Sequence, residues 1–492
     1  MTNYGLYVDG ADVASASGET FDALNPTTGQ AWATHALAAD ADVDGAVRAA
    51  GAAFEGEAWR ALSPTRRGRL MMRWADLIAE QAEEIAAVEV RDNGKLYTEM
   101  VAQLRAIPDW LYYFGGLADK IEGRVIPLDK TSVLNYTLRE PLGPIGIIVP
   151  WNSPVLLTMY ALAPALAAGN TIVLKPSEHA SASVLETVRL SADAGLAPGV
   201  INVVTGMGDA GAALVDHPGI AKVAFTGSET TGKRIAERAG SRLAPVTMEL
   251  GGKSPNIVFA DAALDAAEAG VLAGIYGAAG QSCVAGSRAL FQRAVYDELL
   301  ERVRTRTEGI VLGDPMDAAT QMGPIANPPQ LARVETMVAA AQAEGARIVA
   351  GGERAALESL PDGLFYRPTI VDGVGNDATI AQDEVFGPVL TVIPFDTEEE
   401  AVALANETRF GLAAAVWTRD VKRAHRLARA IRAGTVWINM YRAITFNSPF
   451  GGYKESGFGR VNGAEAIDGF LQTKSVWTEL SDDVQDPFVM RI

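Results

Sequence analysis

Five short apolar runs in the middle of the chain decide the fold. They are Ile145-Gly-Ile-Ile-Val149, Thr171-Ile-Val-Leu174, Val200-Ile-Asn-Val-Val204, Lys222-Val-Ala-Phe225 and Val246-Thr-Met248. Continuous rather than alternating apolar residues are typical of strands that are buried on both faces of a parallel sheet. Most gaps between the runs are long enough to hold a helix. The region therefore predicts a βαβ series and a doubly wound domain of the nucleotide-binding type.

A second series of apolar runs follows residue 250, with alanine-rich segments between its members. These runs are Asn256–Phe259, Leu390–Ile393, Ala413–Trp417 and Thr435–Ile438. They predict a second α/β unit. Two alternating segments, 131–138 and 473–478, fit neither series. Exposed strands of this kind often pair with another subunit.

The chain before the first series predicts a strand, a turn and a long helix. Leu6–Gly10 reads as a strand that enters an Asp-Gly turn. Ser63 and Pro64 have the pattern of an N-cap and a first helical residue. Apolar residues then recur at helical spacing up to Gly94, which predicts one amphipathic helix with a core-facing side. Those residues are Leu70, Trp74, Leu77, Ile78, Ile85 and Val88.

The composition excludes several classes of protein. There are 42 Lys and Arg residues against 60 Asp and Glu residues, so the net charge is −18 and phosphate backbones and anionic bilayers are repelled. One cysteine excludes an intrachain disulfide framework and a Cys-rich metal site. The first residues show no signal-peptide pattern, and no apolar run is long enough to span a bilayer. We therefore expect a cytoplasmic protein that binds neither nucleic acid nor a membrane.

The single thiol lies in Gly280-Gln-Ser-Cys283-Val-Ala-Gly286. A lone cysteine is often an inert buried residue. The flanking glycines instead allow the backbone to approach a ligand closely, and a loop leaves the thiol reachable. Both properties favour a nucleophile.

Two polar residues follow predicted strands of the first series. Glu249 precedes Leu-Gly-Gly252 at the end of the fifth strand, where a carboxylate points into the ligand crevice of an α/β sheet. The alternative is a solvated loop residue. Asn152 follows the first strand and offers a neutral amide that can hold an oxyanion. Its alternative role is the N-cap of a helix over 154–167.

Three further stretches suggest a dinucleotide. Lys175 and Glu178 follow the second strand and suit the hydroxyls of an adenosine ribose, although a surface ion pair explains them equally well. Gly227-Ser228 and Gly232 bound a helix start, whose free N–H groups suit a pyrophosphate. The segment 205–211 matches the GxGxxG pattern but follows the third strand, so we expect only a loop that touches adenine near Gly208.

The four histidines are scattered and have no metal-binding or triad spacing. The sequence thus predicts no metal site. A hydride-transfer enzyme without zinc or a histidine base would have to use covalent catalysis.

Seven motifs, taken in order, resemble the aldehyde dehydrogenase superfamily over residues 5 to 480. They are Pro150-Trp-Asn152, Lys175-Pro-Ser-Glu178, Phe225-Thr-Gly-Ser228, Glu249-Leu-Gly-Gly252, Gly280-Gln-Ser-Cys283, Glu384-Val-Phe-Gly-Pro388 and Ser448-Pro-Phe-Gly-Gly452. The resemblance is to the non-acylating branch that uses NAD or NADP. It implies that an aldehyde is oxidised to a carboxylic acid with NAD, through a thiohemiacetal and a thioester.

The resemblance also implies roles for individual residues. Cys283 would be the nucleophile and Glu249 the general base, and Asn152 with the Cys283 backbone N–H would form the oxyanion hole. Cofactor contacts would come from Trp151, Lys175, Glu178, Gly208, Gly227, Ser228, Gly232, Glu384 and Phe386. Within that set, Glu384 would hold the nicotinamide ribose and Phe386 would pack near the nicotinamide ring. Substrate contacts would come from Tyr113, Ser153, Leu157, Tyr160, Ser282, Val284, Ile444 and Phe450.

The family fold implies two doubly wound Rossmann-type α/β domains and a β oligomerisation arm. By this analogy residues 1–122 and 143–250 form the NAD-binding domain, 251–470 the catalytic domain, and 123–142 with 471–492 the arm. Family members are usually homodimers or homotetramers, so a homo-oligomer is expected.

The chain departs from the family pattern at two places. Many relatives carry a glutamate after the motif that ends at Arg460, where this chain has Val461-Asn462. Ser153 stands where aromatic residues are frequent, which suggests a roomier or more polar tunnel. The lining suits an aromatic or polar aldehyde. Arg442 suits a semialdehyde that carries a carboxylate, unless it is a surface residue.

Two other functions remain open at the level of sequence. A CoA-acylating semialdehyde dehydrogenase typically lacks the base at the position of Glu249, so the presence of Glu249 argues against it. A catalytically silent protein with this fold is disfavoured by the intact Cys283, Glu249 and Asn152.

Overall fold

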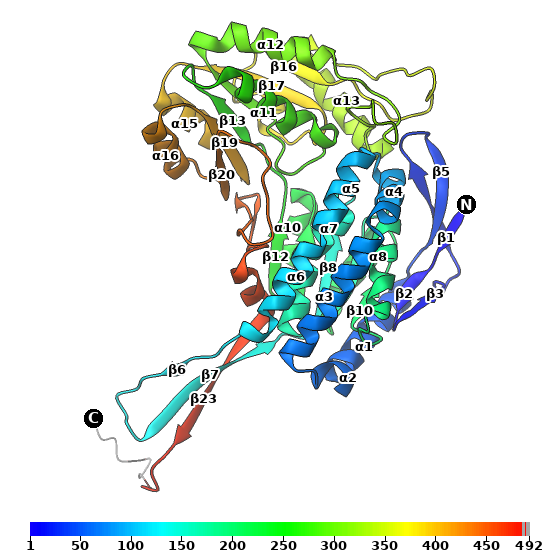
Figure 1. Ribbon diagram of the computed structural model, residues 1–492, viewed down its shortest axis with the longest axis vertical. Coiled ribbons are helices and arrows are strands. Elements are labelled where there is room, and N and C mark those ends of the chain that lie inside the picture. The colour runs from blue at the N-terminus through cyan, green and yellow to red at the C-terminus, as the bar shows by residue number, and fades with distance from the viewer. Residues whose placement is uncertain (485–487, 489–492) are drawn as a thin grey trace.

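The structure, a computed structural model, describes residues 1–484 and 488. Two large sheets carry helices on their faces, and a narrow three-stranded sheet projects from the rest of the molecule (Figure 1). The first sheet lies in the middle of Figure 1 with the blue, cyan and green segments, and the second lies above it in green, yellow and brown. This is the α/β architecture that the apolar runs predict.

The first sheet contains all five runs of the first series as strands. Its order is β22-β12-β11-β8-β9-β10-β2-β3, and neighbours from β12 to β10 are parallel. The chain passes from β8 through β9 to β10 on one side and returns to β11 and β12 on the other. Ligands of open α/β sheets bind where the strand order reverses in this way. The bounds are β8 (Pro144–Val149), β9 (Thr171–Pro176), β10 (Ile201–Val203), β11 (Lys222–Thr226) and β12 (Val246–Glu249).

Helices connect and cover these strands. Between them run α7 (Pro154–Ala168), α8 (Ala182–Asp193), α9 (Gly208–Asp216) and α10 (Glu229–Ser241), with α1 (Asp40–Glu55) and α2 (Glu57–Arg60) before them. The N-terminal strands are β1 (Thr2–Tyr4), β2 (Leu6–Val8), β3 (Ala11–Val13), β4 (Thr20–Asn25) and β5 (Gln30–Ala36). The predicted strand and turn at Leu6–Gly10 is confirmed, with Asp9 and Gly10 at positive φ.

The predicted helix from residue 64 to Gly94 is wrong in one respect, because it is two helices. They are α3 (Pro64–Glu80) and α4 (Ala82–Asn93), and Ser63 caps the first by accepting a hydrogen bond from the Arg66 amide at 3.3 Å. Gln81 leaves helical geometry at φ −107° and ψ 16°. Apolar residues keep their helical spacing across the break, so periodicity alone does not reveal it. Next come α5 (Tyr97–Ala106), α6 (Pro108–Leu117) and the short η1 (Ala118–Lys120).

The second sheet has the order β15-β16-β17-β14-β13-β19-β20 and is parallel except at β15. Four of its strands were predicted: β13 (Pro255–Val258), β17 (Val389–Phe395), β19 (Ala413–Trp417) and β20 (Thr435–Ile438). The sequence did not reveal β14 (Arg288–Gln292), β15 (Arg347–Ala350) or β16 (Thr369–Asp372). A charged or polar residue stands at an end of each. In β14 that residue, Arg288, is fully buried.

The remaining elements complete this half of the molecule. Its helices are α11 (Leu264–Tyr276), η2 (Gly277–Gly280), η3 (Arg293–Val295), α12 (Tyr296–Glu308), α13 (Pro328–Ala343), α14 (Thr379–Gln382), α15 (Glu398–Asn406) and α16 (Val421–Ala430). A small separate sheet pairs β18 (Phe410–Gly411) with β21 (Tyr453–Lys454).

The two segments that fitted neither series pair with each other. β7 (Val133–Pro141) and β23 (Leu471–Glu479) are antiparallel over nine residue pairs, and β6 (Val125–Ile126) joins the far edge of β7. The three strands form the projection at the lower left of Figure 1. Of the predicted arm, residues 485–487 and 489–492 lie outside the described residues.

The end of the predicted catalytic domain returns to the first sheet. β22 (Gly457–Phe458) pairs with β12, with Met248 opposite Phe458, and η4 (Ala464–Phe470) packs against α7. Residues 457–470 therefore contact the unit that precedes residue 250, although the predicted boundary assigns them to the later one. In the described part of the chain, no helix has the length and apolar character needed to cross a membrane.

Candidate active site

Two cavities meet at Cys283. One, of about 350 Å³, lies at the carboxyl ends of β8, β11 and β12 and is closed by Glu384 and Phe386. The other, of about 270 Å³, lies among α5, α6, α7 and the loops around residues 283 and 444. Cys283, Asn152 and Leu157 line both. We call them the crevice and the tunnel.

The loop before Cys283 is held in an unusual backbone conformation. Ala278, Ala279 and Gly280 have φ values of 55°, 51° and 71°, which L-residues rarely adopt in succession. A Cβ added at Gly280 would overlap the carbonyl oxygen of Gly387. The loop is further fixed by Gln281, whose Oε1 accepts a hydrogen bond from the Ala326 amide at 2.9 Å. The backbone is thereby positioned with little freedom.

The Cys283 thiol is partly exposed and lines both cavities, so the reading as an inert buried cysteine does not hold. Burial raises the pKa of Cys283 to about 12, and Glu384 and Glu249 add to the shift. The backbone N–H of Val284 and the charge of Arg442 act in the opposite direction. Without a further positive charge or a base, the thiol is protonated at neutral pH.

Asn152 points toward the same loop. Its Nδ2 donates to the carbonyl of Gln281 at 3.0 Å, which leaves the second Nδ2 proton for another acceptor. The helix that follows is preceded by Ser153, not Asn152, so the alternative role of Asn152 as its N-cap is wrong. The amide is 7% exposed and lines both cavities, as an oxyanion donor requires.

Glu249 ends β12 and is only 5% exposed, which excludes the alternative of a solvated loop residue. Neither carboxylate oxygen has a hydrogen-bond partner among the described residues. Burial raises the pKa of Glu249 well above its usual value, and Arg460 opposes the shift. Such a carboxylate binds a proton strongly, as a general base in a closed site must.

The crevice has the shape and polar groups that a nicotinamide nucleotide needs. Trp151 and Phe386 stand edge to face at 5.3 Å, and Glu384 accepts a hydrogen bond from the Gly252 amide at 3.0 Å. A Cβ at Gly251 would overlap the Glu384 carboxylate. Burial raises the pKa of Glu384 to about 7, so its ionised form is less favoured than that of an exposed glutamate, and a hydroxyl donated by a bound ligand would stabilise that form.

Among the predicted cofactor residues, Gly227 and Ser228 also line the crevice, and Ser228 caps α10 by accepting from the Thr231 amide at 3.3 Å. Lys175 and Glu178 form an ion pair of 3.4 Å at the end of β9, outside the crevice lining. Gly208 begins α9. A Cβ at Gly232 would meet Leu250 at 2.6 Å, so this glycine serves the packing of α10 on the sheet.

Most predicted substrate residues line the tunnel: Ser153, Leu157, Tyr160, Ser282, Val284, Ile444 and Phe450. Tyr113 does not. Its ring lies 5.2 Å from that of Phe446, which also contacts Trp110 at 5.9 Å. Trp110, one turn earlier on α6, lines the tunnel instead.

Sequence reasoning also missed other residues of the two cavities. Lys95, Gln103 and Ala106 line the tunnel, and Gln330, Arg333 and Arg409 line the crevice. They come from helices, from the short loop after α4 and, for Arg409, from the bend before β18, and their placement depends on the tertiary fold. The only local signal is for Lys95, which directly follows Gly94, the left-handed residue that ends α4.

The departure at Val461-Asn462 has a structural counterpart. The Trp110 indole donates to Asn462 Oδ1 at 2.7 Å, and both residues are buried. Val461 is buried as well and bridges to Phe450. Neither side chain can carry a proton as a glutamate does. Among the described residues, no group of three or more His, Cys, Asp or Glu side chains could hold a metal ion.

Comparison with known proteins matches residues 13–476 to the model of the aldehyde dehydrogenase family. The (Z)-2-((N-methylformamido)methylene)-5-hydroxybutyrolactone dehydrogenase of Acinetobacter baylyi is 43% identical over 496 residues, with both chains covered completely. The betaine aldehyde dehydrogenase of Brucella anthropi is 42% identical over 98% of each chain.

Solved structures of aldehyde dehydrogenases also match the fold of this chain. The betaine aldehyde dehydrogenase of Staphylococcus aureus in complex with NAD+ superposes with a TM-score of 0.97 at 37% identity, over 99% of this chain and 97% of that one. An NAD+ complex of the Bacillus cereus aldehyde dehydrogenase gives a TM-score of 0.95 at 42% identity, over 97% of each chain.

The fold and the site define an oxidoreductase that acts on aldehydes with NAD as the acceptor. The chain belongs to the aldehyde dehydrogenase family.

Proposed function

We propose that Cys283 is the nucleophile that attacks an aldehyde bound in the tunnel, and that the adduct is oxidised by NAD bound in the crevice. The observation that carries this proposal is that the Cys283 side chain lines both cavities. A nucleophile at their junction can hold the carbonyl carbon on one side and present its hydrogen to an acceptor on the other.

In the first step the Cys283 thiolate attacks the aldehyde carbon, forms the C–S bond and moves the carbonyl electron pair to oxygen, which gives a tetrahedral thiohemiacetal oxyanion. The free Nδ2 proton of Asn152 and the backbone N–H of Cys283 would stabilise its oxyanion. Bound NAD supplies the acceptor for the hydride that leaves this carbon, and its positive ring favours the thiolate. The loss of hydride leaves a thioester on Cys283.

Glu249 then removes a proton from water, and the hydroxide attacks the thioester carbon; the C–S bond breaks to release the carboxylic acid and the Cys283 thiolate, and the water proton stays on Glu249. Its raised pKa makes it a stronger base than an exposed carboxylate. With Val461 and Asn462 beside the site, no neighbouring glutamate is available there to accept the proton from Glu249. Glu249 therefore bears more of the deacylation.

For the cofactor, we assign Glu384 to the nicotinamide ribose, with Phe386 and Trp151 beside the ring. Gly227 and Ser228 are assigned to the pyrophosphate at the start of α10, with Gly208 near the adenine and Gly232 in the helix behind. The Lys175–Glu178 pair is assigned to the adenosine ribose. Its carboxylate would repel a 2′-phosphate, so NAD is preferred and NADP is the weaker acceptor.

The arm supports a further proposal, that the protein is a homodimer or homotetramer. Several of its apolar side chains are exposed, among them Val125 at 73% and Trp477 at 63%. Such a sheet is covered when another subunit packs on it.

Two substitutions test the mechanism, the first through the absorbance of NADH and the second through the mass of the acyl-enzyme. Cys283→Ser should abolish NADH production from every aldehyde, and activity within tenfold of the unmodified enzyme would reject the nucleophile. Glu249→Gln should slow deacylation and leave an acyl-enzyme that mass spectrometry detects. Adding CoA separates the alternative of a CoA-acylating enzyme, since only that enzyme would release an acyl-CoA.

A further inference from the structure

The tunnel has a charge pattern that the chain as a whole does not share. Its titratable lining includes Lys95 and Arg442, and no aspartate or glutamate lines it. In contrast, Glu229, Glu249 and Glu384 line the crevice. The chain has a net charge of −18, so a cavity lined by two cations and by no acidic side chain differs from the rest of the protein and favours an anionic ligand.

We propose that Lys95 and Arg442 bind a carboxylate at the end of the substrate remote from the aldehyde, so that the substrate is an ω-oxo acid. This inference rests on the proposed function and names the substrate class of the same site.

Lys95 is 6% exposed, and its Nζ donates to Ser153 Oγ at 2.6 Å. That bond uses one of three ammonium protons, and Ser153 itself lines the tunnel. Burial lowers the pKa of Lys95, Glu99 and Glu89 oppose this shift from outside the tunnel lining, and Arg442 lowers the pKa further. A ligand anion bound between Lys95 and Arg442 would favour the charged form of Lys95. The small side chain of Ser153 leaves room for the ammonium at the cavity wall.

Arg442 is held by several independent contacts. Its Nη1 donates to the carbonyl of Ala273 at 3.2 Å, and a Cβ at Gly277 would overlap that nitrogen. Its own φ is 64°, a left-handed value that costs free energy in a non-glycine residue. Glu99 lies 3.9 Å from Nη2 and is outside the tunnel lining. Arg442 is therefore held in place by its neighbours, which argues against the alternative that it is a free surface residue.

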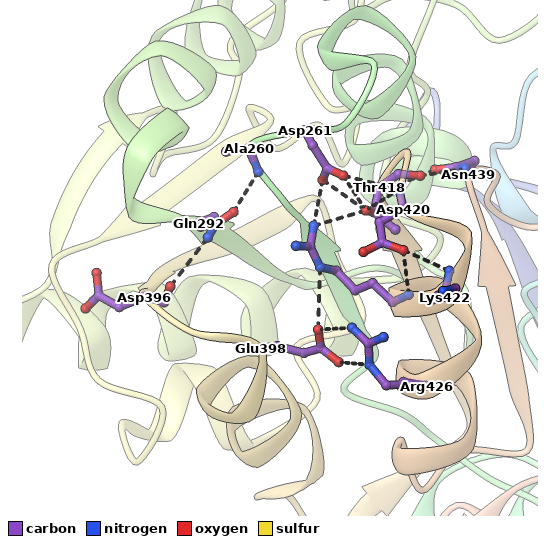
Figure 2. A network of polar contacts seen from close by, with 11 residues as sticks. Ala260, Asp261, Gln292, Asp396, Glu398, Thr418, Asp420, Lys422, Arg426 and Asn439 are labelled. Atoms are coloured by element: carbon purple, nitrogen blue, oxygen red, sulfur yellow. Dashed lines mark hydrogen bonds and ion pairs between the residues drawn. The ribbon is translucent and has the colours of Figure 1, made fainter.

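The loop that carries Arg442 is anchored at its start. Asn439 follows β20 and exchanges two hydrogen bonds with the backbone of Thr418, each of 3.0 Å, while Thr418 Oγ1 donates to Asp261 (Figure 2). The same network continues to Glu398 and Arg426. It fixes the point from which the chain turns toward the tunnel.

The rest of the tunnel fits a short chain that ends in a polar group. Trp110, Tyr160 and Phe450 provide aromatic walls. Gln103 also lines the tunnel, so its side-chain amide is a further candidate donor for a carboxylate. A guanidinium and an ammonium bind a carboxylate with strong, charge-assisted hydrogen bonds.

The test compares aldehydes of equal length that differ only in the distal group. With saturating NAD, kcat/KM is measured for 4-oxobutanoate and butanal, for 5-oxopentanoate and pentanal, and for trimethylammonioacetaldehyde. We expect the better of the two oxo acids to exceed its neutral partner at least tenfold, and the cationic aldehyde to be the poorest. Succinate or glutarate should inhibit competitively against the aldehyde, and Arg442→Gln should weaken that inhibition.

Arg442→Gln should reduce the ratio of kcat/KM for the oxo acid over its neutral partner by about 10- to 100-fold. The ratio is the measured quantity because loss of the Arg442 charge near Cys283 acts on both aldehydes alike. Lys95→Met should act in the same direction; if it fails to fold, Arg442→Gln decides alone. The matched control is Arg105→Gln, which removes the same charge from the exposed face of α5, where Arg105 pairs with Glu83. It should leave the preference unchanged.

The proposed activity and the carboxylate site can be refuted separately. If no aldehyde is oxidised, the proposed function is wrong. If neutral aldehydes are oxidised but neither oxo acid is preferred, or if Arg442→Gln does not change the preference, only the carboxylate site is wrong.

Discussion

Gly280→Ala is the substitution for which the structure gives the clearest expectation. The residue has φ 71° and lies three positions before Cys283, against the carbonyl of Gly387. The left-handed conformation costs an alanine about 1–2 kcal/mol. Overpacking against backbone that cannot rotate away adds about 1–3 kcal/mol. The sum is about 2–5 kcal/mol, which the loop can avoid only by moving.

Movement of the loop displaces the sulfur. A shift of about 1 Å at a reacting group can cost about a hundredfold in rate, so we expect kcat/KM to fall by about that factor. The assay is steady-state NADH production, together with the apparent melting temperature from circular dichroism.

The matched control is Gly51→Ala, in α1, where an added Cβ meets nothing within 4 Å. Removing a helical glycine should stabilise the protein by about 0.5–1 kcal/mol and leave kcat/KM unchanged. If Gly280→Ala keeps kcat/KM within threefold of the unmodified enzyme and has the same apparent melting temperature as the control, the positive φ and the contact with Gly387 do not constrain the loop before Cys283.

Three other predictions concern single polar groups. Asn152→Ala should lower kcat by about 10²- to 10³-fold with little change in KM, because it removes one oxyanion donor; an equal rise in KM with kcat preserved would assign Asn152 to substrate binding. Glu178→Gln should narrow the ratio of kcat/KM for NAD over NADP, and an unaltered ratio would place the discriminating group elsewhere. Asp92 is buried in α4, and burial raises its pKa from 3.8 to about 8. Its contribution to the free energy of unfolding is therefore complete below pH 4, where it is protonated in both states, and is lost as the pH rises toward 8. The apparent melting temperature of Asp92→Asn should exceed that of the unmodified protein by an amount that grows between pH 4 and pH 8, and a constant difference would mean that Asp92 is ionised throughout.

The first sheet could be predicted from the sequence because each of its central strands is buried on both faces. A run such as Thr171–Leu174 has no polar residue after its first position, and the structure buries all of it. The second sheet was predicted less completely. Arg288 is fully buried in β14, where its guanidinium donates to the carbonyls of Leu404 and Ala405 and to Asn376. Those partners lie far along the chain, so local sequence cannot show that this arginine belongs to a core strand.

Part of the candidate active site could likewise be predicted from local sequence, and part could not. Asn152, Glu249 and Cys283 could be chosen because each lies at the end of a strand or in a glycine-flanked loop, and the structure brings all three to the crevice. Lys95 could not be chosen in this way. Its position depends on the packing of α4 and α5 beside Ser153, and a lysine after a helix end is ordinarily a solvated residue. The resemblance assigns Tyr113 to the tunnel, but the tunnel lining does not include it, and its ring lies 5.2 Å from that of Phe446.

The pairing of β22 with β12 affects how the protein is made on the ribosome. Until residues 457–458 have emerged, the strand that ends in Glu249 has a free edge, and Leu250 lacks the carbonyl of Ser456 to which its amide donates at 3.0 Å. An unpaired strand edge is a starting point for aggregation during synthesis. A nascent chain that stalls before this point has nearly its whole length, but β12 still lacks its neighbour and Glu249 lacks the pairing with Gly457. Loss of residues 457–458 would therefore leave this strand edge exposed in an otherwise complete sheet.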